Sequence, residues 1–164
     1  MHPTLMIHGA TMIRLLFILG FLAAPALADA PLVVLDRTQL PFDVGPGNPA
    51  NSPSRPGNAP HAAWNSSGNT ANSSSAWENR PSNPANEKRL IFTAQGDVLG
   101  YYARNAGGVL NLFDVNGRRV AYRPARGTQS LFTTAGTWCG TVDNLRDGSF
   151  VLAVTPECVR EFRR

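Results

Sequence analysis

Histidine, cysteine and lysine are scarce in this 164-residue chain, and their scarcity excludes several kinds of chemistry. Two of the three histidines precede the first apolar run, which leaves His61 alone in the remainder. One histidine in a polar stretch cannot supply a Ser-His-Asp or Cys-His arrangement on a folded domain. The two cysteines are not in a C-x-x-C spacing, and no zinc-type ligand cluster or glycine-rich phosphate loop is present. We therefore expect no cofactor, no metal and no enzymatic activity.

Long apolar runs are also missing, apart from one near the N-terminus. Residues 13–22 are almost uniformly apolar, and Ala26 and Ala28 follow as the small residues of a signal-peptidase site. Ten apolar residues are too few to span a bilayer. The pattern predicts a cleaved secretory signal over residues 1–28, with Met12 as a possible alternative start. An uncleaved membrane anchor is the other interpretation, and only in that case do we expect contact with a membrane.

Charge is low and nearly balanced. The formal net charge is +4 and falls to +3 if the segment that carries Arg14 is removed. An exported chain of this charge is an unlikely partner for nucleic acid. Export also predicts that Cys139 and Cys158 form a disulfide, because the compartment outside the cytoplasm is oxidising. We expect a periplasmic or secreted protein.

Two different kinds of sequence follow the signal. Residues 29–44 contain one short apolar segment, which could form a strand confined to an edge by Pro31 and Pro41. Residues 45–88 are rich in Asn, Pro, Ser, Gly and Ala and predict a disordered linker, because such a segment buries little apolar surface. The tetrapeptide Asn-Pro-Ala-Asn occurs twice in it, ending at Asn51 and Asn86. Trp64 and Trp77 are its candidate docking residues.

One sequence pattern occurs three times between residues 90 and 142. Each copy has a Phe, a Gly four residues later, and a small residue eight positions after the Phe. The three sets are Phe92, Gly96 and Gly100, then Phe113, Gly117 and Ala121, then Phe132, Gly136 and Gly140. Each copy predicts a β-hairpin in which Gly makes the turn and the small residue allows close packing. We expect the Phe and the Tyr that follows each turn to share one core.

The domain predicted over residues 89–164 is therefore all-β, a small antiparallel hairpin meander. Its strands are expected over residues 89–93, 97–104, 109–115, 118–122, 130–134, 137–142 and 149–155, the last one a degenerate fourth unit. Residues 157–164 could form a helical turn. A disulfide from Cys139 to Cys158 would pin this tail and stabilise the domain.

The clearest copy reads Leu-Phe-Asp-Val-Asn-Gly-Arg-Arg-Val-Ala-Tyr over residues 112–122. This hairpin and its relatives over residues 90–152 resemble the bacterial four-fold beta flower proteins. The resemblance implies a small β-repeat fold and brings no established catalytic or binding residues.

Basic and acidic side chains remain as candidate sites. The candidate binding arginines of the first two hairpins are Arg104, Arg118, Arg119, Arg123 and Arg126. They could form a surface for an anionic envelope component, and strand alternation would place Arg119, Ala121 and Arg123 on one face. The alternative is the solvated face of a half-buried sheet. The carboxylates that could serve as an acid/base pair in a small hydrolase are Asp97, Asp114, Asp143 and Asp147.

The sequence thus favours an exported, non-catalytic β-repeat module that binds an envelope component or another envelope protein, or has a structural role there. A small secreted hydrolase and an interbacterial effector or inhibitor are the alternatives.

Overall fold

The described residues form one closed β-barrel wrapped on one side by a coil. The computed structural model describes residues 30–34, 40–86, 89–146 and 149–164. The barrel strands are β1 (Ala30–Val34), β2 (Leu90–Phe92), β3 (Val98–Arg104), β4 (Leu110–Asp114), β5 (Arg119–Arg123), β6 (Ser130–Thr133), β7 (Trp138–Asn144) and β8 (Phe150–Val154). A helix, α1 (Pro156–Phe162), ends the chain. The all-β prediction and the seven predicted strands are confirmed, with boundaries that differ by one or two residues.

Three hairpins with the same geometry make up most of the barrel: β2–β3, β4–β5 and β6–β7. Their turn glycines, Gly96, Gly117 and Gly136, have φ values of +87°, +80° and +87°, a region that glycine adopts without strain. Each hairpin also has a register shift, with one extra residue in its second strand: Leu99, Val120 and Cys139. The repeated sequence pattern therefore corresponds to a repeated backbone with a β-bulge at the same position, which was not predicted from the sequence.

The barrel is closed by β1, and this corrects the predicted open meander. Residues at the start of β1 pair in parallel with β2, and Leu32, Val33 and Val34 pair in parallel with β8. The first apolar segment is thus neither unpaired nor an edge strand. After β8 the chain forms α1 and not the second strand of a fourth hairpin. The strand β1 fills that position between β8 and β2.

The barrel has two apolar layers rather than one. Aliphatic side chains and Tyr102 fill the interior, where Ile91, Leu112 and Leu131 are fully buried. The repeat aromatics lie on the outer face: Phe113 stacks on Tyr101 at 5.0 Å between ring centroids, and Tyr122 packs against Phe132. The expected pairing of Phe with Tyr therefore exists, but outside the barrel core.

The helix α1 covers one end of the barrel, next to the Gly96, Gly117 and Gly136 turns. Thr155 caps it by accepting a hydrogen bond from the Cys158 backbone N–H, and Phe162 reaches the interior core. The predicted disulfide is confirmed: Cys139 of β7 is bonded to Cys158 of α1, with the two Cα atoms 5.3 Å apart. The predicted helical turn is confirmed as well.

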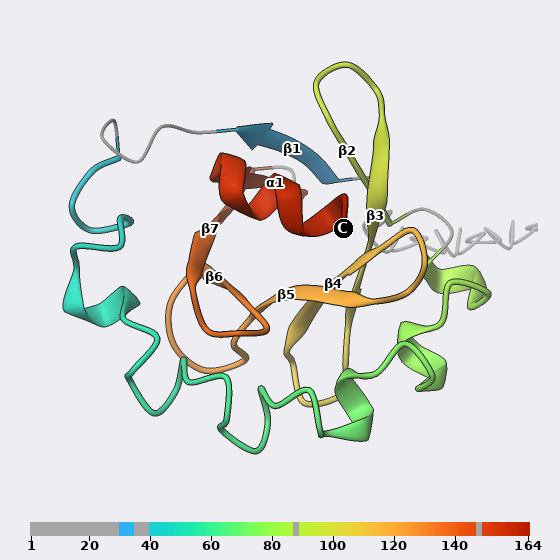
Figure 1. Ribbon diagram of the computed structural model, residues 1–164, viewed down its shortest axis with the longest axis horizontal. Helices are drawn as coiled ribbons and strands as arrows, with labels where there is room; N and C mark the ends of the chain where they lie inside the picture. Colours follow the sequence, from blue (N-terminus) through green and yellow to red (C-terminus); the bar gives the residue numbers. More distant parts are fainter. Residues whose placement is uncertain (1–29, 35–39, 87–88, 147–148) are drawn as a thin grey trace, which may run out of the picture.

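The segment predicted to be a disordered linker is an ordered coil with a seven-residue period. We call residues 45–86 the asparagine coil, after the buried residue that ends each of its six repeats. These residues are Asn51, Asn58, Asn65, Asn72, Asn79 and Asn86. It also contains four short 3-10 turns, η2 (Pro49–Asn51), η3 (Thr70–Asn72), η4 (Trp77–Asn79) and η5 (Pro84–Asn86). In Figure 1 the coil is the arc from cyan to green along one side of the barrel.

Side-chain amides take the place of an apolar core in this coil. Each of the six asparagines donates Nδ2 hydrogen bonds of 2.7–3.1 Å to the backbone carbonyls eight and six residues earlier. Its backbone N–H bonds the carbonyl three residues earlier. Hydrogen bonds therefore connect successive repeats of the coil. The side-chain amides supply the donors that its buried carbonyls need.

The asparagine coil is also bonded to the barrel. Asn105 and Asn111 donate to Asn72 Oδ1 at 2.7 and 3.3 Å, and Tyr122 donates its hydroxyl to the Asn58 carbonyl at 2.7 Å. These contacts explain why the outer face of β4 is fully buried. The coil therefore forms the cover of the outer aromatic layer, not a tether.

The predicted signal over residues 1–28 lies outside the described residues. Within the described part of the chain, no helix has the length and apolar character needed to cross a membrane.

Candidate binding surfaces

Two of the predicted binding arginines are committed to holding the fold. The Arg119 guanidinium donates to Asn111 Oδ1 and to the Asn65 carbonyl, both at 2.8 Å, and lies 4.9 Å from the Tyr122 ring centroid. Burial lowers its pKa to about 10. Arg118 pairs with Asp114 at 2.9 Å and donates to the Glu161 carbonyl. Arg119 joins barrel to coil, and Arg118 joins the β4–β5 turn to α1.

The predicted arrangement of Arg119, Ala121 and Arg123 on one face is wrong. The bulge between Leu112 and Phe113 places Arg119 opposite Phe113 on the outer face, whereas Ala121 lies in the interior core. A single extra residue changes the face of everything beyond it. Arg104 and Arg123 lie instead at the end of the barrel away from α1, and Arg126 is exposed in the following connection.

The two linker tryptophans are exposed on the asparagine coil. Trp64 is 40% and Trp77 is 58% accessible, and Trp77 begins η4. The Asn72 and Asn83 side chains bond the carbonyls of Trp64 and Trp77 respectively, so both tryptophans have fixed backbones. Nothing in the structure shows what contacts their rings.

The candidate catalytic carboxylates are spread over the barrel. Asp114 is buried, and its Oδ1 accepts hydrogen bonds from the backbone N–H groups of Asn116 and Arg118, both at 2.9 Å. Asp97 is exposed at the end covered by α1, and Asp143 is exposed near the opposite end of β7. Asp147 lies outside the described residues. The role of Asp114 is to hold a turn, which is the common use of Asp there.

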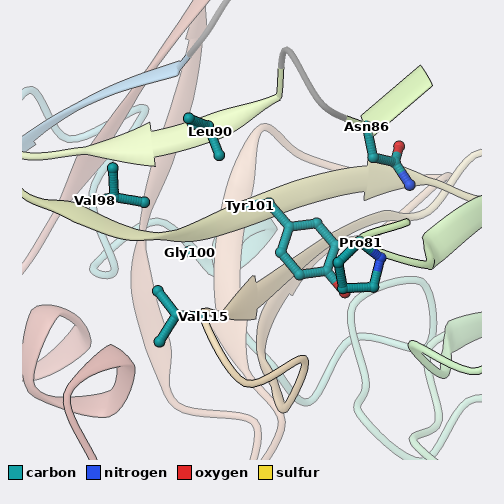
Figure 2. A pocket seen from close by; sticks show the side chains of 7 residues that line it. All are labelled: Pro81, Asn86, Leu90, Val98, Gly100, Tyr101 and Val115. Atoms are coloured by element: carbon teal, nitrogen blue, oxygen red, sulfur yellow. The ribbon is translucent and has the colours of Figure 1, made fainter. Parts of the chain in front are cut away.

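An apolar pocket lies where the end of the asparagine coil meets the first two hairpins. Its volume is about 310 Å³, and its lining includes Pro81, Leu90, Val98, Tyr101 and Val115. Figure 2 shows these side chains together with Asn86, with Pro81 and Asn86 coming from the coil and the others from the first two hairpins. Leu90, Val98 and Val115 are 37%, 50% and 61% exposed. Sequence reasoning missed this pocket because its walls are up to 34 positions apart in the chain.

Tyr101 forms the aromatic wall of the pocket. The residue is 6% exposed, its ring is stacked on Phe113, and its hydroxyl has no hydrogen-bond partner among the described residues. Burial raises the pKa of Tyr101 to about 12, with a further contribution from the charge of Asp114. A buried hydroxyl without a partner is unfavourable for the folded protein.

No family model, curated protein or solved structure matches this chain. The interpretation of its surfaces therefore rests on geometry, and the resemblance to four-fold beta flower proteins stays a prediction.

The two buried tyrosines should respond in opposite ways to loss of the hydroxyl. We expect Tyr101→Phe to leave the free energy of unfolding unchanged or raise it by up to about 1 kcal/mol, because it removes an unpartnered polar group. Tyr122→Phe should lower it by about 1–2 kcal/mol, because the bond to the Asn58 carbonyl is lost. Urea denaturation of both variants measures the difference, and an equal loss in the two would contradict the assignment.

Proposed function

We propose that this protein is an exported, non-catalytic binding module that takes a small, mostly apolar ligand into the pocket of Figure 2. The observation that supports this is the apolar pocket itself, whose walls are aliphatic side chains and the Tyr101 ring. Ligand sites in proteins are commonly hollows of about 300 to 1,000 Å³ with apolar walls and a few polar atoms. The pocket therefore suits a small apolar group.

Export is the second part of the proposal. The Cys139–Cys158 disulfide fits a protein that folds in an oxidising compartment. A periplasmic or secreted location would place the pocket where envelope lipids and other apolar envelope components are present. The rigid barrel walls suit a binding role, since a preformed pocket needs little ordering when the ligand enters.

A neutral apolar dye tests the pocket directly. Nile red should bind the chain from residue 29 to residue 164 saturably, with an increase in fluorescence. We expect Val115→Asp to weaken this binding about tenfold or more, because the charge must be desolvated when the dye enters. Tyr101→Phe should have little effect, since it keeps the aromatic wall and removes an oxygen that is buried away from the dye.

Leu145→Asp is the matched control, because Leu145 is also an exposed apolar residue beside a turn but lies away from the pocket. Its affinity for the dye should equal that of the unmodified protein. Equal weakening by both variants, or no saturable binding by the unmodified protein, would contradict the proposed pocket.

A further inference from the structure

The two ends of the barrel are chemically different. One end is covered by α1, where Arg160 pairs with Glu157, and Arg164 just beyond the helix pairs with Glu161. The opposite end is formed by the connections after β3, β5 and β7. It carries Arg104, Arg123 and Arg126, and the neighbouring Asp143 is on the strand face that points away from the interior.

The strand register places Arg104 and Arg123 on the interior face of this end. Arg104 pairs with Leu110 across β3 and β4, and Leu110 pairs with Arg123 across β4 and β5. Directly opposed residues in an antiparallel sheet project from the same face. Leu110 belongs to the interior core, so the two arginines lie at the rim of the barrel above that core.

Neither arginine is neutralised by the protein. No ion pair joins Arg104 or Arg123 to a carboxylate within the described ranges. Arg104 donates to the Gly108 carbonyl and Arg123 to Gln129 Oε1, both uncharged acceptors, and the Arg123 Nε is buried without a partner. Burial lowers the pKa of Arg123, and the charge of Arg104 lowers it further. The positive charges of Arg104 and Arg123 therefore lie on the same face of the barrel without a carboxylate partner in the described ranges.

We infer that Arg104 and Arg123 bind a phosphate-type oxyanion at the open end of the barrel. Guanidinium groups bind such anions through paired N–H donors, and neither arginine has a carboxylate partner to displace in the described ranges. The anion would also remove the repulsion between the two arginines. This site is separate from the apolar pocket and is formed by different residues. An experiment can therefore disprove one proposal and leave the other standing.

Thermal unfolding in inorganic phosphate tests the site. The midpoint of the chain from residue 29 to residue 164 should rise saturably with phosphate, on the order of 5 °C, relative to sodium chloride at equal ionic strength. Arg104→Gln should abolish this rise. The same variant should unfold in sodium chloride at the same or a higher temperature than the unmodified protein, because a like charge has been removed.

Arg160→Gln is the control, since it makes the same charge change on α1 at the far end. It should keep the full phosphate response, and so should Val115→Asp. An equal midpoint in phosphate and chloride, or a response that survives in Arg104→Gln, would overturn the inference.

Vesicles separate a lipid headgroup from a soluble anion. If the ligand is a headgroup, the protein should sediment with phosphatidylglycerol vesicles and not with phosphatidylcholine vesicles, and Arg104→Gln should abolish this. A phosphate response without vesicle binding assigns the site to a soluble phosphate compound. Vesicle binding without a phosphate response counts against the site, because general attraction to the surface explains it.

Discussion

Asn72→Ala should destabilise the protein by about 3–5 kcal/mol, although it removes one small polar side chain from a segment with almost no apolar residues. Asn72 is fully buried and its amide makes four hydrogen bonds. Nδ2 donates to the Trp64 and Ser66 carbonyls, and Oδ1 accepts from Asn105 and Asn111. Alanine removes the donor to the Trp64 carbonyl and the acceptor of the Asn105 and Asn111 Nδ2 groups, and each buried group left unpaired costs about 1–3 kcal/mol.

Asn69→Ala is the control within the same repeat. Its amide also bonds the backbone, to the Ala63 carbonyl and the Ala71 N–H, but these contacts are solvent-exposed. We expect a loss of at most about 1 kcal/mol, because water replaces the lost partners. Urea denaturation gives both values, and limited proteolysis should cut the asparagine coil faster in Asn72→Ala alone. Similar small losses in both variants would show that the buried amides do not hold the coil.

Removing the disulfide by Cys139→Ala with Cys158→Ala should destabilise the protein by about 3 kcal/mol. The two cysteines are 19 residues apart, and the bond limits the freedom of the unfolded chain in this loop. It also fixes α1 across the end of the barrel, where Phe162 is 5% exposed. Loss of the bond should therefore expose interior core residues near the helix.

Reductant provides the matched measurement. The unmodified protein in reductant should unfold at the same urea concentration as the double variant, and the variant should not respond to reductant. Mass spectrometry after alkylation without reduction should detect no free thiol in the unmodified protein. Two alkylated cysteines in that sample would disprove the bond.

Local sequence patterns were sufficient to predict the hairpins but not how they close. The Phe-to-Gly spacing around Gly96, Gly117 and Gly136 fixes each turn, because the interactions involved lie within about ten residues. Closure depends on β1, whose partners in β8 are 120 positions away. Nothing near Leu32 indicates that pairing. The face of Arg119 was mispredicted for a similar reason, since simple alternation ignores the extra residue, Val120, between Arg119 and Ala121.

The asparagine coil shows where compositional reasoning fails. A segment poor in aliphatic residues is expected to be disordered because burial cannot offset its ordering entropy. In residues 45–86 the stabilising contacts are amide-to-carbonyl hydrogen bonds at a seven-residue period, and docking on Tyr122 and Asn105 of the barrel adds to them. The two Asn-Pro-Ala-Asn copies end 35 positions apart, a multiple of seven, and this was the available signal.

The closing strand also has a consequence for how the chain is made. Leu32 pairs with Leu152, so β1 leaves the ribosome first and gains its β8 partner only when almost the whole chain is present. The three hairpins need only local contacts and form early, whereas closing a loop of this length is slow. During synthesis the apolar β1 therefore stays without that partner, and the nascent barrel stays open along one seam.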